Sequence, residues 1–572
     1  MPDKYDTKFK QYWGHSKLKS LQKQIIKTMV EEPGDSLVVM RTGFGKSVCY
    51  QLPFLMLKNK CIIVISPLIA LMEDQKQSLI DKNIPVIALN SNMTTGVKEM
   101  EKLSIIEGEN KIIYMSPEYL VKNYDFIEEL YNDDRLGFVA LDEAHCVSSW
   151  GHDFRPDYQS LTCLKTWFPN LPIMALTATA TRKTRDEIVE TLQLDDYYEF
   201  VSSFDRPNLY IECKQKTSNM GNDLQPYIDE FSNQFCIVYA RTIANVKKVC
   251  EHLNNHGVVA KEYHGSMTKN QRTNTQTEFA NGNFKWIVAT VAFGMGIDQD
   301  VTLVLHYGAP PDIESYYQEI GRAGRTGEPA TCAMICGPGD MVVNRILLSE
   351  ITDKEHKKHK ERQIRHMEEF IRASTCRRKK LLTYFGESAK KLICTNCDTC
   401  LRDQSKGDEI VTGIQWPMFM FKCLMAHENM YMGSANILKI ILGNKIKPIA
   451  KYHDSLFFNA GKEYCKDPTF WKKIIEIAQC NNYVIDETIP SGRGVVMKPS
   501  LELKEWYNTI KPIISEHKLT GFDYDNYLSI QHLVQCDYEI PSTCLDIDKF
   551  IRKHTATLLE LSIEDELDMA TI

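Results

Sequence analysis

Hydrophobic residues in the first 345 positions come in short runs, and the stretches between the runs have the spacing of amphipathic helices. The pattern occurs twice, with a restart after residues 204–208. Short apolar runs that alternate with helices are typical of a parallel sheet with crossover helices. The expected strands are residues 36–40, 61–66, 111–116, 137–142 and 173–177 in the first half, and 235–240, 258–263, 286–290, 303–307 and 331–336 in the second.

The pattern changes again toward the C-terminus. Residues 353–378 have a basic, helical pattern and run into a group of cysteines that ends at Cys400. Residues 413–508 read as helices followed by a strand–turn–strand at 483–498, which favours a winged helix. We therefore predict an α/β protein with parallel-sheet domains at 1–207 and 208–345, a helical module at 346–402, a winged-helix domain at 403–511 and an unassigned segment at 512–572.

Composition limits the class of protein. The 572 residues are 43% hydrophobic, which is enough for several packed cores. Residues 1–11 are polar, and no stretch approaches the roughly 18 apolar residues of a membrane span, so we expect a soluble intracellular protein of the nucleus or cytoplasm with no membrane partner. Eighteen cysteines spread over a long chain without a signal peptide suggest reduced, buried thiols.

Charge is distributed unevenly along the chain. The net charge of −7 argues mildly against nucleic acid, because Lys and Arg drive phosphate binding. Residues 354–391 are nevertheless rich in Lys and Arg, whereas residues 558–572 are acidic. The sequence therefore remains compatible with a local basic surface.

Residues 42–47 (TGFGKS) follow an apolar run and open an expected helix, which is the setting of a phosphate loop. Its glycines let backbone N–H groups wrap phosphates, Lys46 neutralises the β/γ charge, and Ser47 can ligate Mg2+. Met40 occupies the first glycine position of the full pattern, so a chance turn is the alternative when the loop is taken alone. The expected nucleotide ligands are Thr42, Gly43, Gly45, Lys46 and Ser47.

Asp142 and Glu143 end the apolar run at 137–142. Asp142 is expected to hold Mg2+, and Glu143 to orient and deprotonate the attacking water. Neighbouring strand residues face opposite ways, so both can serve only where the strand ends. An isolated pair is more often simply solvated, but a pair about a hundred residues after the lysine loop favours a nucleoside triphosphatase.

In this order the motifs resemble those of superfamily 2 helicases and, within them, the RecQ family of DNA helicases. The resemblance covers residues 13–500. It implies two RecA-like domains, ATP as substrate with Mg2+, 3′-to-5′ movement on single-stranded DNA, and unwinding of forked or partly duplex DNA in repair, recombination or replication. We also expect a monomer as the working unit.

Several motifs of the first domain carry this resemblance. Residues 13–22 resemble the family's nucleotide motif, in which Gln22 is implied to read adenine, with His15 and Lys19 where the family usually has Tyr and Arg. Residues 66–75 and 116–118 resemble strand-tracking motifs, which implies that Ser66 and Ser116 contact phosphates; ordinary strand-to-helix turns are the alternative. Residues 177–180 (TATA) resemble the motif that transmits the ATP state between domains.

Residues 145–156 resemble the aromatic-rich loop peculiar to RecQ proteins. Trp150 and Phe154 would stack on unpaired bases, and Arg155 would pair with phosphate. The alternative places both aromatic residues in the core. A loop crowded with Gly, Ser, His, Asp and Pro makes a poor core strand, so we favour the DNA contact.

The second domain carries the matching half of the predicted ATP site. Residues 318–325 (QEIGRAGR) resemble the superfamily's sixth motif, with Gln318, Arg322 and Arg325 as candidates for the γ-phosphate and Arg325 as the arginine finger. Two arginines three apart on a helix would share one face, and a solvated face is the alternative. Thr290, in a fifth-motif-like segment, and Arg241, in a fourth-motif-like one, are implied to contact DNA.

Four cysteines form the pattern C-x17-C-x2-C-x2-C, namely Cys376, Cys394, Cys397 and Cys400. Thiolates at this spacing suit a structural tetrahedral Zn2+. Buried thiols, a redox pair and an iron–sulfur cluster are the alternatives. The expected winged helix resembles the RecQ C-terminal module, but its hairpin turn offers Pro490 to Arg493 in place of an aromatic wedge, which leaves Arg493 as a candidate phosphate contact.

Two other functions remain open. An RNA helicase of the same superfamily would use the same ATP site, because phosphate and stacking contacts do not distinguish the sugars. A structure-binding scaffold without catalysis is disfavoured by the complete set Lys46, Asp142, Glu143, Gln318 and Arg325.

Overall fold

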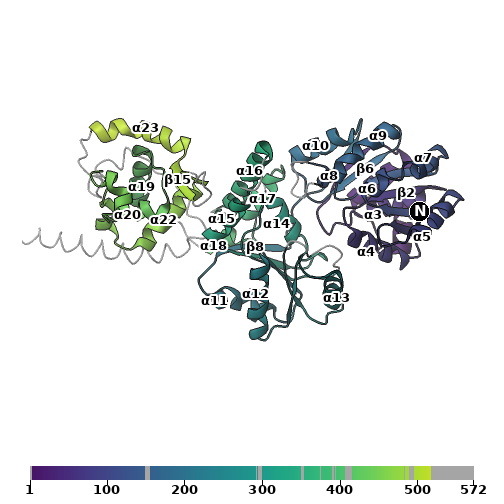
Figure 1. The fold of residues 1–572 in the computed structure, drawn as a ribbon, viewed down its shortest axis with the longest axis horizontal. Coiled ribbons are helices and arrows are strands. Elements are labelled where there is room, and N and C mark those ends of the chain that lie inside the picture. Colours follow the sequence, from purple (N-terminus) through teal and green to yellow (C-terminus); the bar gives the residue numbers. More distant parts are fainter. Residues whose placement is uncertain are drawn as a thin grey trace, which may run out of the picture.

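The computed structural model describes residues 3–516 except 149–154, 291–292, 294–298, 349–352, 374, 390–391, 393, 406–414, 456, 482 and 489–494. Trp150, Phe154 and Arg493 lie outside the described residues. Four regions follow one another along the chain (Figure 1): a first sheet domain, a second sheet domain, a helical module packed on the second sheet domain, and a C-terminal region. We call the two sheet domains lobe 1 and lobe 2, and the helical module the zinc module.

Lobe 1 is built on a seven-stranded parallel sheet in the order β3-β4-β2-β5-β6-β1-β7. Its central strands are completely buried, because helices cover both faces. The strands are β1 (Ser36–Val39), β2 (Cys61–Ile65), β3 (Val86–Leu89), β4 (Ile112–Met115), β5 (Leu136–Leu141), β6 (Ile173–Thr177) and β7 (Tyr198–Val201). The helices are α1 (Lys4–Trp13), α2 (Ser20–Glu31), α3 (Val48–Met56), α4 (Ile69–Ile80), α5 (Thr95–Ile106), α6 (Pro117–Val121), α7 (Tyr124–Asn132), α8 (Pro156–Gln159), α9 (Cys163–Trp167) and α10 (Arg182–Leu192), with 3-10 turns at Ala144–Val147 and Ser160–Thr162.

Lobe 2 has a six-stranded parallel sheet in the order β10-β11-β9-β12-β13-β8. The strands are β8 (Leu209–Gln215), β9 (Cys236–Ala240), β10 (Ala260–Tyr263), β11 (Trp286–Ala289), β12 (Leu303–Tyr307) and β13 (Ala330–Cys336). The helices are α11 (Met220–Phe231), α12 (Ile243–Asn255), α13 (Lys269–Ala280), α14 (Ile313–Ile320) and α15 (Pro338–Leu347). The predicted pair of tandem RecA-like parallel-sheet domains is confirmed.

The zinc module consists of α16 (Lys354–Ile371), α17 (Arg377–Tyr384) and α18 (Asp398–Ser405). Its apolar residues join one continuous core with those of both lobes, through side chains such as Phe204, Phe385 and Cys397. The module is therefore packed into the body of the molecule.

The C-terminal region has a core of its own around Trp416, Phe419 and Trp471. Helices followed by an antiparallel strand pair agree with the predicted order, but a further helix follows the strand pair and was not predicted. The 3-10 turn Lys447–Tyr452 joins two of the helices. Asp486 lies 3.7 Å from both Arg345 and Arg372, so ion pairs connect this region to α15 and to the end of α16. The elements are α19 (Gln415–His427), α20 (Ser434–Ile441), α21 (Ala460–Tyr464), α22 (Pro468–Cys480), β14 (Val484–Thr488), β15 (Val495–Pro499) and α23 (Leu501–Glu516).

Residues 202–208 join the two lobes, and the zinc module holds this linker. Glu387 accepts hydrogen bonds from Ser203 Oγ (2.7 Å) and Phe204 N (2.8 Å). The Phe204 and Phe385 rings stack with centroids 4.6 Å apart. Arg378 donates to Asp205 Oδ1 at 2.8 Å. The path between the two sheets is therefore fixed by residues that come 173 to 184 positions later in the chain.

The fifteen cysteines whose side chains the structure describes are all free, and twelve of them are buried. This agrees with the expected reduced thiols. Within the described residues, no helix is both long enough and apolar enough to cross a membrane.

Candidate ATP site between the lobes

The phosphate-loop residues 42–47 connect β1 to the N-terminus of α3. Gly43 and Gly45 have φ of 76° and 85°, which L side chains rarely adopt. A Cβ at Gly45 would also lie 2.5 Å from Gln22 Nε2. The loop thus has the shape and the helix N-terminus that a bound anion requires.

Gln22 anchors this loop. Its Nε2 donates to the backbone oxygens of Phe44 (3.0 Å) and Gly45 (3.2 Å), and its Oε1 accepts from Lys19 N at 3.0 Å. Lys19 Nζ donates to Phe44 O at 3.2 Å and lies 4.2 Å from the centre of the Phe44 ring. His15 is exposed and packs beside Phe9. Of the three candidate adenine-side residues, the structure therefore brings Gln22 and Lys19 to the loop.

Asp142 and Glu143 follow the end of β5 at Leu141. Glu143 has φ 50° and ψ 46°, a left-handed conformation that bends the chain directly after the strand. Its Oε1 consequently lies 3.3 Å from Lys46 Nζ, while Asp142 is buried behind it and accepts from Glu143 N at 3.0 Å. Adjacent carboxylates can serve one site only where the strand ends, because neighbouring strand residues face opposite ways. This backbone turn meets that condition.

The surroundings shift the pKa values of the Asp142 and Glu143 carboxyl groups in opposite directions. Burial raises the pKa of Asp142 to about 6, although the charge of Lys46 acts in the opposite direction. Against the effect of burial, the charge of Lys46 and a hydrogen bond with His145 hold the pKa of Glu143 well below its usual value. Glu143 is therefore ionised, as a group that orients or deprotonates water has to be.

His145 extends this network toward β6. Its Nδ1 lies 3.3 Å from Glu143 Oε2 and 3.0 Å from Thr177 Oγ1. Thr177 Oγ1 in turn accepts from Thr179 N at 3.2 Å, within residues 177–180. Burial alone would lower the pKa of His145, but its interactions with Cys146 and Glu143 raise it to about 10. A polar chain thus runs from Lys46 to the segment expected to transmit the ATP state.

Lobe 2 contributes residues 318–325, which lie against the phosphate loop. A Cβ at Gly321 would lie 2.8 Å from Thr42 Cβ, and one at Gly43 would lie 3.5 Å from Arg325 Cγ. The Arg322 side chain is 8% exposed, and its buried Nε has no hydrogen-bond partner among the described residues. Gln318 is half-buried on the last turn of α14. A phosphate oxygen would satisfy the unpaired Nε donor, so the residues present fit a nucleotide.

The expectation that Arg322 and Arg325 share a helix face is wrong. Helix α14 ends at Ile320, and the two arginines lie in the turn that follows, where Gly324 has φ 52°. Arg206 of the linker holds this turn: its Nη2 donates to Ala323 O and Gly324 O, both at 2.7 Å. Asn208 Nδ2 donates to Gly324 O at 3.0 Å. A linker side chain, and not helical spacing, therefore positions both arginines.

The candidate DNA contacts that the structure describes fall into two groups. In lobe 1, Arg155 Nη1 donates to Pro67 O at 2.7 Å, which joins the end of the 145–156 loop to residues 66–75. Ser66 is buried, with an Oγ that has no partner among the described residues, and Ser116 caps α6 by accepting from Tyr119 N. In lobe 2, Thr290 follows β11, and half-buried Arg241 donates to Asn344 at 2.8 Å.

The four cysteines of the predicted zinc site converge. The Sγ atoms of Cys376, Cys394, Cys397 and Cys400 all lie within 4.8 Å of one another, and the first three residues are buried. A hydrogen bond from Cys376 holds the pKa of Cys397 below its usual value. Four sulfur donors at this spacing fit a structural Zn2+. Asp398, beside the cluster, accepts from Arg377 Nε at 2.6 Å and from Cys213 N of β8 at 3.0 Å.

Models of three protein families match this chain: DEAD/DEAH box helicase at residues 19–188, helicase conserved C-terminal domain at 222–327, and RecQ zinc-binding at 338–401. Together with an ATP site shared by two parallel-sheet lobes, these matches define the class, an ATP-dependent helicase with a structural zinc.

Curated relatives narrow this class. The chain is 36% identical over 472 residues to the ATP-dependent DNA helicase RecQ of Haemophilus influenzae, which covers 82% of this chain and 74% of that protein. It is 36% identical over 491 residues to a putative ATP-dependent RNA helicase of Acanthamoeba polyphaga mimivirus (85% and 88%). It is 35% identical over 508 residues to the mouse bifunctional 3′-5′ exonuclease/ATP-dependent helicase WRN (83% and 36%). The chain belongs to the RecQ family of ATP-dependent DNA helicases, as the motifs indicated.

Proposed function

We propose that this chain uses ATP hydrolysis to move 3′-to-5′ along single-stranded DNA and to unwind forked or partly duplex DNA in repair, recombination or replication. We further propose that it acts as a monomer inside the cell. One observation carries the proposal: the phosphate loop of lobe 1 and the arginine turn of lobe 2 meet at Thr42–Gly321 and Gly43–Arg325. An ATP site divided in this way can couple hydrolysis to lobe movement.

We assign the reaction to side chains on both sides of this interface. Lys46 neutralises the β- and γ-phosphates, and Ser47 and Asp142 are the residues that would hold Mg2+, which supplies charge neutralisation when bound. Phosphate binding competes with Glu143 for Lys46, since the two side chains now form an ion pair. Its loss leaves the Glu143 carboxylate available to orient and deprotonate the attacking water.

The residues of lobe 2 couple the bound nucleotide to the distance between the two lobes. Gln318, Arg322 and Arg325 approach the γ-phosphate from lobe 2, so ATP favours the closed arrangement and hydrolysis removes the bridge between the lobes. Each cycle then shifts the grip on the strand. Ser66, Ser116, Arg155, Arg241 and Thr290 are the proposed backbone contacts, with Trp150 and Phe154 as base-stacking residues.

The remaining regions complete the proposed architecture. We assign lobe 1 to residues 1–207, lobe 2 to 208–345, the zinc module to 346–402 and a winged-helix domain to 403–511. The five helices and the β14–β15 pair support the winged-helix assignment. In that domain Arg493 is the proposed phosphate contact of the hairpin turn.

The direct test compares ATP hydrolysis by the purified protein with no polynucleotide, with single-stranded DNA and with single-stranded RNA. The proposal predicts strong stimulation by DNA over RNA. Preference for RNA would move the assignment to an RNA helicase, the name that the mimivirus relative carries. Hydrolysis in none of the three conditions would favour a non-catalytic scaffold.

A further inference from the structure

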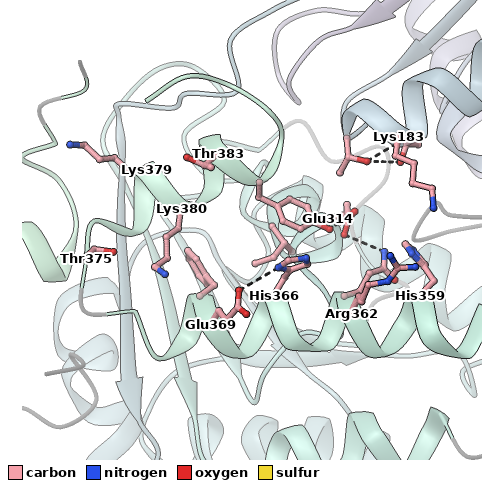
Figure 2. Close-up of a pocket in the computed structure, with 16 residues that line it drawn as sticks. Lys183, Glu314, His359, Arg362, His366, Glu369, Thr375, Lys379, Lys380 and Thr383 are labelled. Atoms are coloured by element: carbon pink, nitrogen blue, oxygen red, sulfur yellow. Dashed lines mark hydrogen bonds and ion pairs between the residues drawn. The ribbon is translucent and has the colours of Figure 1, made fainter. Parts of the chain in front are cut away.

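A groove with a volume of about 610 Å3 lies where lobe 1, lobe 2 and the zinc module meet. Its walls come from α10 of lobe 1, from the start of α14 of lobe 2, and from α16 and α17 of the zinc module. Figure 2 shows Lys183 of α10 directed across this groove toward His359 and Arg362 of α16. We call it the seam groove, because a ligand in it would touch parts of the chain that belong to different lobes.

The seam groove carries excess positive charge. Lys183, Arg362, Lys379 and Lys380 line it, against the carboxylates of Glu314 and Glu369. Glu314 is buried and accepts from Tyr384 Oη at 2.6 Å, and burial raises its pKa to about 7, so it is partly neutral at physiological pH. Glu369 lies 3.4 Å from His366 Nδ1. A hydrogen bond with His366 lowers the pKa of Glu369 against the effect of burial, so Glu369 is ionised, and the four cations still leave a net positive charge.

Two of these cations face each other from opposite sides of the seam. Burial and then the charge of Arg362 lower the pKa of Lys183, while Glu187 and Glu355 act in the opposite direction. Repulsion between like charges on lobe 1 and on the zinc module opposes their approach. An anion between Lys183 and Arg362 would convert this repulsion into a bridge.

The floor of the groove is apolar and aromatic. Ile313 and Phe370 are buried beneath it, and the accessible aromatic surface is the half-buried Tyr384 ring, which packs edge-on against His366 with centroids 5.5 Å apart. Cations beside aromatic surfaces are the combination that binds nucleotide units, with charge for the phosphate and ring faces for the base. The volume lies within the range of pockets for ligands of that size.

The groove lies on the same helix that supports the expected DNA loop. Ser148, the last described residue before the aromatic part of that loop, donates to Glu187 of α10. Glu187 is four residues from Lys183, so the two side chains share one face of the helix. The described end of the 145–156 loop and the seam groove therefore meet the same face of α10.

We propose that the seam groove binds a nucleotide unit of single-stranded nucleic acid and forms a second contact for the strand beyond the lobe surfaces. The proposal rests on the proposed function and adds a site to it. Because the walls come from both lobes, the contact depends on how closely the lobes approach. The strand is held there in the closed, ATP-bound arrangement and released when the lobes separate.

The test uses two charge-matched double variants of the full-length protein. K183A/R362A removes the facing cations, whereas R182A/R365A removes two exposed arginines from the same helices that do not line the groove. Affinity for fluorescent oligothymidylates of increasing length is measured against salt, with a non-hydrolysable ATP analogue. We expect K183A/R362A to weaken binding of long oligomers about tenfold and to reduce the salt slope by about 1.4, for two lost phosphate contacts.

Three results would overturn the proposal. Equal losses of affinity in both double variants would mean that only the overall positive charge matters. A loss of affinity that does not depend on oligomer length would place Lys183 and Arg362 among the DNA contacts on the lobe surfaces. If thymidine monophosphate competes with the labelled oligomer as strongly as unlabelled oligomer at the same nucleotide concentration, the ligand of the groove is a free nucleotide. Binding is measured without ATP turnover. The test therefore decides whether the groove binds DNA even where the protein does not hydrolyse ATP.

Discussion

Arg206→Ala should impair catalysis through the arginine turn. Arg206 is 8% exposed and bonds Ala323 O and Gly324 O at 2.7 Å, and it also reaches Gly321 O at 3.5 Å. Hydrogen bonds from a charged donor contribute roughly 1.5–3 kcal/mol each. If the released turn loses about 2.7 kcal/mol of preorganisation, the value of one strong bond, kcat should fall about 100-fold.

The assay is DNA-stimulated ATP hydrolysis, with kcat and KM for ATP determined separately. A positioning role lowers kcat while KM changes only a few-fold, and R206K should recover part of the loss. Arg135→Ala is the matched control, because Arg135 also donates to backbone oxygens, those of Ile106 and Glu109, but within lobe 1. A kcat for R206A within threefold of wild type, in folded protein, would refute the reasoning.

Three further outcomes are expected. Lys46→Ala should abolish hydrolysis and leave the circular-dichroism spectrum unchanged, and residual turnover above one percent of wild type would contradict the role of Lys46. Cys397→Ser should lose zinc, measured by atomic emission, and lower the thermal midpoint, because the Cys394–Cys400 segment also contacts β8 and the linker; full stability without zinc would exclude this coupling. Glu314 has a raised folded pKa, so its proton favours the fold at low pH and that stabilisation is lost as pH rises through about 7. Glu314→Gln should therefore reduce the fall of the thermal midpoint between pH 5.5 and pH 8, and an unchanged pH dependence would show that Glu314 does not contribute.

The sequence predicted the central strands and the edge strand β10, and it missed the other three edge strands. Strands such as β2 and β5 are buried on both faces, so each reads as one continuous apolar run. The missed strands β3, β7 and β8 all lie at sheet edges, where one side lacks a neighbour. In β7, three of the four residues are exposed, and its sequence therefore carries no clear apolar signal.

The candidate ATP site was predicted where the chemistry is local. The lysine loop and the carboxylate pair each lie in one short segment, and the structure brings Lys46 and Glu143 to 3.3 Å. Arg206 and Asn208 were not predicted as site residues, because their partners are backbone carbonyls that are distant in sequence. His145 was not predicted either, although one of its two partners, Glu143, is only two residues away. An Arg-Pro-Asn sequence at the junction of two sheet patterns was the available signal, and it was used only to place a boundary.

The hydrogen bonds between the zinc module and the linker connect this module to the ATP site. Glu387 and Arg378 hold Ser203 to Asp205 from one side, and Arg206, the next residue, holds the arginine turn from the other. Asn396, between two zinc-ligand cysteines, donates to Pro207 O at 3.0 Å. A metal that orders Asn396 therefore stabilises the linker from which Arg206 reaches the turn. Loss of zinc should consequently lower kcat along the same path as R206A, and combining C397S with R206A should cost less than the sum of the two separate losses.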